Sequence, residues 1–147
     1  MKNKKIQLKI CKAMLDANRS LTIGDVGTEA VAVTLDGYIA YSFLKSECIF
    51  DITKIPSIKN DFLDELFEID EKDELLTVTP YKISYKGKIV QKLTCDNADI
   101  YLDEKLYKKI KKFKLYGYES DKRILALDNF DCPIAIVMPV RVCEDEI

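Results

Sequence analysis

The 147-residue sequence contains no histidine, the side chain that most often serves as a general base or metal ligand in enzymes. It also contains no glycine-rich phosphate loop, no G-x-S-x-G nucleophile motif and no paired-carboxylate motif. We therefore expect a protein that is not an enzyme and that binds no cofactor or metal ion.

Arginine is scarce beside the many lysines, and it occurs only as Arg19, Arg123 and Arg141. Arginine supplies the planar fork that reads guanine edges, whereas lysine acts as a point charge. If the chain contacts DNA, this composition favours contacts to the phosphate backbone over the reading of bases.

The five cysteines are odd in number and form no C-x-x-C pair, so they indicate a reducing compartment and neither a disulfide framework nor a zinc site. No apolar run is long enough to span a bilayer, and no apolar run of a signal peptide follows the basic N-terminus. We expect a cytoplasmic protein that does not bind membranes. The cysteines are Cys11, Cys48, Cys95, Cys132 and Cys143.

Charge is segregated along the chain, although the net charge of −2 selects no class of partner. Lysines dominate residues 1–19 and 103–113, whereas residues 61–74 are acidic. An acidic cluster could hold Mg²⁺, but these residues lie mostly on an expected helix surface without loop geometry. The acidic residues are Asp61, Asp64, Glu65, Glu68, Asp70, Glu71, Asp73 and Glu74.

Residues 99–142 carry the clearest pattern, a strand, a basic helix over 103–113 and then three strands. Apolar residues recur there at helical spacing, with acidic residues at the start of the helix and lysines at its end. The apolar positions are Leu102, Leu106, Ile110 and Phe113, and the strands are expected at 115–118, 124–127 and 134–142.

The earlier residues repeat part of this pattern. The expected elements are a helix over 6–18 (entered from a strand at 4–8 in one interpretation), strands at 31–34, 38–43 and 48–52, a helix at 61–68, and a hairpin of 75–85 with 89–94. Pro80 makes the first hairpin strand an edge strand or a broken one. Six tyrosines are expected to be half-buried packing residues: Tyr81, Tyr85, Tyr101, Tyr107, Tyr116 and Tyr118.

The pattern predicts an α+β protein with two main helices packed on antiparallel sheet, and it suggests a βαβββ repeat. We expect a single domain of 1–147, in which the first half covers about 1–56 and the second about 75–142. A connector helix at about 60–69 joins the halves, and an acidic tail follows at 143–147.

Three segments resemble the DNA polymerase sliding clamp family. Residues 136–142, IVMPVRV, are similar to that family's terminal strand. Residues 100–102, IYL, resemble the entry to a clamp helix, and residues 33–40, VTLDGYIA, resemble its Thr-Asp-Gly hairpin with one extra residue. A bacterial clamp chain has three such domains, whereas this chain has room for one, as in small clamp-like proteins of phages and mobile elements.

The resemblance implies two helices side by side, with sheets outside them and lysines facing the DNA backbone. The lysines in these positions are Lys5, Lys9, Lys12, Lys105, Lys108, Lys109 and Lys112. The family's peptide groove would correspond to Val137, Met138, Pro139, Val140 and Arg141. The tail at 143–147 departs from the family pattern and could cover that groove.

Our first hypothesis is a clamp-like binding protein of a phage or mobile element in a bacterial host cell. It would contact duplex DNA without sequence preference, alone or as a homo-oligomer, or it would bind replication proteins. Stacking on single strands is not expected, since only Tyr107 interleaves these lysines. The alternative is a small inhibitor or anti-defence protein that binds a host protein through Asp61, Asp64, Glu65 and Glu68. A small structural or assembly protein is the third possibility.

Overall fold

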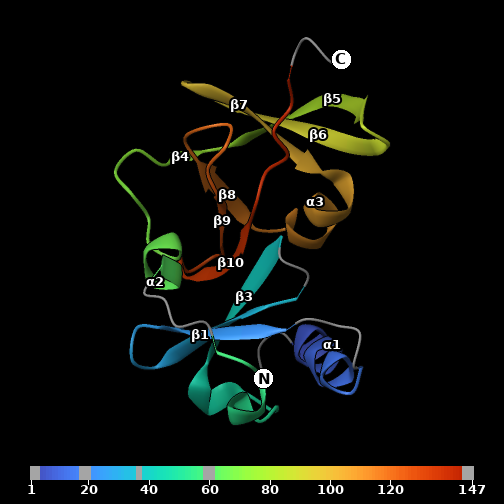
Figure 1. Ribbon diagram of the computed structural model, residues 1–147. Coiled ribbons are helices and arrows are strands. Elements are labelled where there is room, and N and C mark those ends of the chain that lie inside the picture. The colour runs from blue at the N-terminus through green and yellow to red at the C-terminus, as the bar shows by residue number, and fades with distance from the viewer. Residues whose placement is uncertain (1–3, 17–20, 36–37, 58–61, 144–147) are drawn as a thin grey trace. The chain divides into compact units, whose positions relative to one another are not determined.

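A computed structural model describes residues 4–16, 21–35, 38–57 and 62–143 (Figure 1). It combines helices with antiparallel sheets, so the predicted α+β class is confirmed. The chain forms two compact units, residues 1–68 and residues 69–147.

The first unit contains a helix, a three-stranded antiparallel sheet and a second, short helix. Strands β1, β2 and β3 pair in sequence order, with Ile23 opposite Val33 and Val33 opposite Tyr41. Its elements are α1 (Lys4–Met14), β1 (Thr22–Val26), β2 (Ala30–Thr34), β3 (Ile39–Leu44), two 3₁₀ turns at Lys45–Glu47 and Ile52–Lys54, and α2 (Phe62–Leu66).

Gln7 fastens α1 to the chain that follows β3. Its side chain is completely buried, and its amide nitrogen donates a 3.0 Å hydrogen bond to the Glu47 carbonyl. The Ile49 N–H in turn donates a 2.7 Å hydrogen bond to the Gln7 side-chain oxygen. The Gln7 side chain therefore forms hydrogen bonds with two backbone groups that could otherwise bond to a neighbouring strand.

The expected strand at 48–52 was wrong, because residues 48–51 form an irregular link between two 3₁₀ turns, the second of which begins at Ile52. Asp51 accepts hydrogen bonds from the Thr53 hydroxyl at 2.6 Å and from the Thr53 N–H at 3.0 Å. These bonds lower the pKa of Asp51, the hydroxyl contact most strongly. Local capping has displaced the strand that the β-rich residues suggested.

Helix α2 packs on β1 within the first unit. A Cβ at Gly24 would overlap the tip of the Leu63 side chain, which would have to move aside for any larger residue. Asp64 accepts a 2.6 Å hydrogen bond from the N–H of Gly27, which sits in the β1–β2 turn at φ +66°. The segment predicted as a connector helix is thus part of the first unit.

The second unit contains one helix and two antiparallel sheets. One sheet has the order β10-β9-β8-β4, and the other has the order β5-β6-β7. Its elements are β4 (Glu74–Leu75), β5 (Thr77–Tyr85), β6 (Lys88–Cys95), β7 (Ala98–Asp103), α3 (Glu104–Ile110), β8 (Lys114–Gly117), β9 (Ile124–Leu127) and β10 (Pro133–Val137). The order β7-α3-β8-β9-β10 matches the predicted βαβββ pattern. In the first unit the described residues begin with α1, followed by β1, β2 and β3, so no strand precedes the helix among them.

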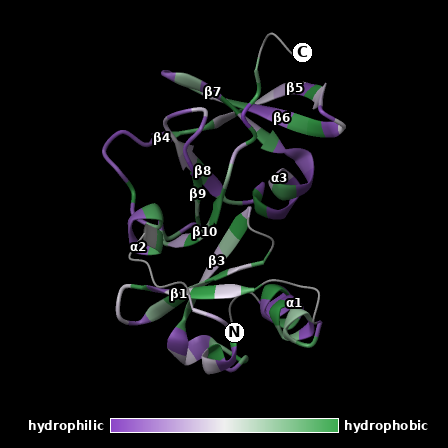
Figure 2. Cartoon of the chain, viewed as in Figure 1, coloured by the Kyte–Doolittle hydropathy of each residue, from purple (hydrophilic) through white to green (hydrophobic). Residues whose placement is uncertain are grey.

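Apolar side chains of α3 and both sheets form the core of the second unit. Ile100 and Leu102 of β7 and Ile110 of α3 are completely buried. A Cβ at Gly117 of β8 would lie 3.1 Å from Ile100, so the two sheets meet closely there. Figure 2 shows the hydrophobic residues of β10 and the mixed colouring of α3, which has one buried side.

Strand β5 is irregular around Pro80, as the sequence predicted. Its register with β6 shifts between Val78 and Lys82. The buried Gln91 side chain donates hydrogen bonds of 2.6 Å and 3.1 Å to the carbonyls of Thr79 and Tyr81. Gln91 therefore supplies hydrogen bonds to two carbonyls that lack a regular partner on β6.

A buried ion pair joins the segment before β4 to the start of β9. Arg123 donates hydrogen bonds of 2.8 Å and 2.9 Å to the two carboxylate oxygens of Asp73. The Arg123 side chain is 6% exposed and the Asp73 side chain is 0% exposed. Asp73 also accepts a 2.8 Å bond from the Asp70 N–H, which shapes the turn before it.

Candidate nucleic-acid interface

Helix α3 presents a row of lysines to solvent. Asp103 caps its first turn by accepting a 2.9 Å hydrogen bond from the Lys105 N–H, and Leu106 and Ile110 are buried beneath it. The lysines of the helix and its C-terminal turn point away from that buried side. The exposed residues are Lys105, Lys108, Lys109, Lys111 and Lys112.

The two acidic residues at the start of α3 already have partners. Glu104 lies 2.7 Å from the Lys82 ammonium and 3.7 Å from that of Lys108, and Asp103 lies 4.0 Å from Lys88. Within the part of the chain that the structure describes, Lys105, Lys109 and Lys111 lie within 4.0 Å of no carboxylate. The helix surface therefore keeps an excess of positive charge.

Replacing Glu104 with glutamine is expected to change how stability depends on pH. The hydrogen bond from Lys82, with help from Lys108, lowers the pKa of Glu104 below its ordinary value of 4.5. A lowered pKa means that the ionised carboxylate stabilises the fold at neutral pH, and that this contribution disappears as pH falls through the folded-state pKa. Urea unfolding should show a less stable Glu104→Gln variant at pH 7 and converging curves in acid. An equal difference at both pH values would contradict the assignment.

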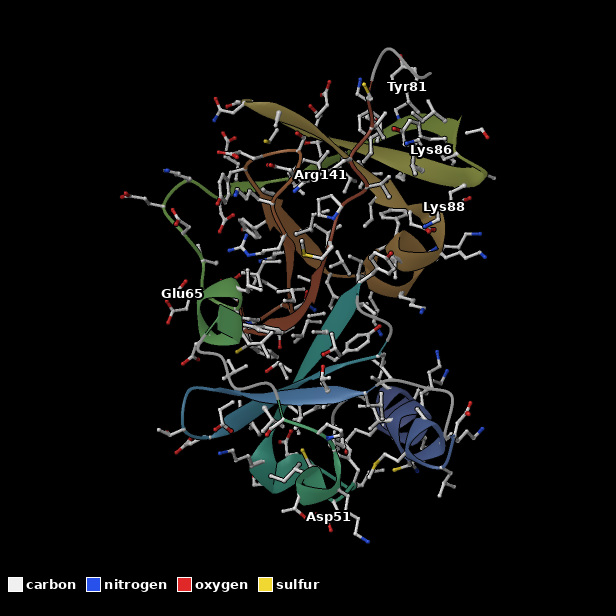
Figure 3. The ribbon with its side chains drawn as sticks, viewed as in Figure 1. Asp51, Glu65, Tyr81, Lys86, Lys88 and Arg141 are labelled. Atoms are coloured by element: carbon white, nitrogen blue, oxygen red, sulfur yellow. The ribbon has the colours of Figure 1, made fainter. Side chains whose placement is uncertain are left out.

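The turn between β5 and β6 adds further lysines beside the start of α3. The Lys82–Glu104 and Lys88–Asp103 ion pairs bring this hairpin to the helix, and Lys86 lies at its tip (Figure 3). Lys82, Lys86 and Lys88 were not predicted as site residues from the sequence. Their signal was the Lys-Gly turn, whose position relative to a helix can be known only from the fold.

The lysines predicted on α1 are also exposed. Lys5, Lys9 and Lys12 lie on the helix in steps of four and three residues, so they share one side of it. Gln7 and Ile10 are buried on the other side. These lysines belong to the first unit and form a second, separately testable surface.

The predicted peptide groove is only partly at the surface. Val137 ends β10 and is completely buried, so its assignment to a surface groove was wrong. Met138 and Arg141 are exposed, whereas Pro139 and Val140 are half-buried. The Val140 N–H donates a 2.8 Å hydrogen bond to the Tyr101 carbonyl, which places this segment beside β7.

The predicted acidic surface is smaller than the sequence suggested. Asp61 lies outside the described residues, and Asp64 is half-buried because it holds the Gly27 N–H. Glu65 and Glu68 remain as exposed carboxylates on and after α2.

Two of the cysteines have perturbed thiols. The thiol pKa values of Cys48 and Cys95 are raised, chiefly by burial, so neither thiol is an activated nucleophile at neutral pH. The five cysteines are free, and among the described residues no three histidine, cysteine, aspartate or glutamate side chains are grouped to hold a metal ion. An open cavity of about 920 Å³ in the first unit is lined mostly by apolar residues of α1 and the segment 50–56.

The comparisons with known proteins give no assignment: no protein-family model, curated protein or solved structure matches this chain. Among the described residues, no helix is long and apolar enough to cross a membrane.

Proposed function

We propose that the protein is a non-enzymatic nucleic-acid-binding protein that contacts the backbone of duplex DNA through the lysines of α3. The observation that supports this proposal best is the row of five exposed lysines over residues 105–112. The neighbouring carboxylates Asp103 and Glu104 already pair with Lys82, Lys88 and Lys108.

The mechanism is neutralisation of phosphates with release of counterions, which makes affinity fall steeply as salt rises. Lysines hold the backbone without reading sequence, so the proposal includes no base specificity. The likeness of residues 136–142 to the sliding clamp ending supports a role beside the replication machinery of a phage or mobile element. The lysines of α1 are the second surface on which such a protein would contact DNA.

Reversing two charges on α3 is expected to weaken duplex binding on the order of tenfold or more. The variant is Lys108→Glu/Lys111→Glu, measured against wild type by fluorescence anisotropy with a labelled short duplex. The slope of log affinity against log salt should fall in magnitude by about two, since two phosphate contacts are lost.

The matched control is Lys72→Glu/Lys122→Glu, which makes the same change in net charge at two exposed positions outside α3. This control should bind duplex within about twofold of wild type if local charge decides binding. Equal losses of duplex affinity in the two variants would mean that net charge, and not the α3 surface, decides binding. Absence of wild-type binding at low salt would refute the proposal.

The acidic alternative has less support. Asp64 holds the β1–β2 turn through Gly27, so it serves the fold, and two exposed glutamates remain. An inhibitor that acts through this surface would lose inhibition in a Glu65→Lys/Glu68→Lys variant.

A further inference from the structure

The sheet β5-β6-β7 brings two tyrosines and a lysine into one row across its strands. Lys92 of β6 stands directly opposite Tyr101 of β7 in the register. On the other side of Lys92, its ammonium lies 5.8 Å from the centre of the Tyr81 ring of β5. Lys92 and Tyr101 share a face because they are paired, and the contact with the Lys92 ammonium puts the Tyr81 ring on that face too.

Helix α3 does not cover this face, although Val90 and Tyr85 on it are buried and the Cys143 N–H reaches the Tyr85 hydroxyl. Tyr101 is half-buried, so the open part of the face is the end that carries Tyr81 and Lys92. The buried residues of the opposite face are Gln91 and Leu93 of β6 with Leu102 and Ile100 of β7, which pair in the register. Lys82, opposite Gln91, reaches Glu104 of α3, so the helix lies on that opposite side.

Tyr81 is 64% exposed, which corrects the expectation that it is a half-buried packing residue. Tyr85, by contrast, is buried, and its hydroxyl accepts a hydrogen bond from the Cys143 N–H. The ring of Tyr81 therefore contributes little to the core and leaves an aromatic surface open beside a cation.

The charges around the row are two balanced ion pairs and two further exposed cations. Asp99 lies 3.5 Å from Lys92, and Asp103 lies 4.0 Å from Lys88, so the two carboxylates of β7 are each paired with a lysine. Arg141 and Lys86 add two exposed cations near these strands (Figure 3).

We propose that this face binds single-stranded nucleic acid, with bases stacking on Tyr81 and Tyr101 and phosphates held by Lys92 and Arg141. In a duplex, neighbouring bases cover both faces of each base, whereas a single strand can present base faces to aromatic rings. The two tyrosines stand two strands apart, roughly 9.5 Å. That spacing suits bases that are splayed and not stacked on each other. The inference concerns a different surface from the α3 lysines and does not depend on duplex binding.

The test uses the full chain with labelled oligothymidine, and oligouridine of the same length as a second probe that distinguishes DNA from RNA. Tyr81→Leu should weaken binding about 5- to 100-fold, because a base loses its stacking partner. Tyr81→Phe should bind within about twofold of wild type, since its ring is kept. Tyr38→Leu is the matched control, a tyrosine that is 59% exposed in the first unit.

A second readout is available because the chain has eight tyrosines and no tryptophan. Stacking should quench tyrosine emission in wild type, and the quenching should be smaller in Tyr81→Leu. Circular dichroism of each variant establishes that it is folded.

The outcomes separate this inference from the proposed function. Lys108→Glu/Lys111→Glu should lose more duplex affinity than single-strand affinity, and Tyr81→Leu the reverse. Unchanged binding of both single-stranded probes by Tyr81→Leu would overturn the inference while leaving duplex binding untouched. The inference would also be overturned if wild-type protein bound duplex but neither single-stranded probe.

Discussion

Replacing Arg123 with alanine is expected to lower the free energy of unfolding by about 3–5 kcal/mol. The guanidinium holds both carboxylate oxygens of Asp73, whose side chain is completely buried. Removing it leaves a buried carboxylate without its cation. Urea unfolding followed by circular dichroism measures the loss.

Two further variants separate the buried charge from packing. Asp73→Leu/Arg123→Met removes both charges and should recover much of the lost stability, because an apolar pair leaves no charge unpaired. Lys114→Ala breaks the exposed ion pair with Asp131 and should cost about 1 kcal/mol or less. An Arg123→Ala effect as small as that of Lys114→Ala would contradict the account.

Replacing Ile110 with alanine is expected to cost about 2–5 kcal/mol, because it opens a cavity where α3 packs. Ile110 is completely buried, and its neighbour Lys109 is exposed. Lys109→Ala, one residue away, should change stability by about 0.5 kcal/mol or less. The same unfolding measurement compares the two variants.

These two substitutions also test which side of α3 faces solvent. Lys109→Ala should weaken duplex binding while leaving stability unchanged. Ile110→Ala should lower stability and, at temperatures where it remains folded, bind duplex as wild type does. A large loss of stability in Lys109→Ala would place that lysine in the core and remove it from the proposed interface.

The helices and hairpins were predictable where local signals agree. The helix expected over 103–113 is α3, and Asp103, which was expected within its first turn, caps it instead. The helix ends at Ile110, and a turn follows in which the Phe113 N–H bonds the Ile110 carbonyl. The hairpin around Lys86-Gly87 was also correct, since Lys86 and Gly87 both adopt positive φ. Pattern and turn chemistry indicate the same structure there.

The remaining elements depend on contacts distant in sequence. Residues 48–52 have β-forming side chains, yet Gln7, more than forty positions earlier, takes the Ile49 N–H. Strand β1 was missed because Thr22–Val26 includes a glycine and an aspartate, both poor strand formers. That glycine leaves room for the tip of the Leu63 side chain of α2.

The candidate site shows the same division. The exposure of the α3 lysines followed from helical periodicity alone. The row of Tyr81, Lys92 and Tyr101 did not, because only the register of three strands brings these separated residues together. The sliding clamp resemblance placed Val137 in a peptide groove, and the apolar run predicted one strand over 134–142, whereas β10 ends at Val137 itself.

The irregular strand β5 has a consequence for solubility. An edge strand with unpaired backbone groups invites pairing with another molecule, and exposed apolar side chains such as Val78 increase that risk. Pro80 has no N–H to offer, and Thr79 accepts the Tyr81 N–H through its hydroxyl. At the opposite edge, Val140 occupies the Tyr101 carbonyl. Both margins of this sheet thus resist the strand-to-strand growth that leads to fibrils, which favours a chain that stays dispersed when concentrated.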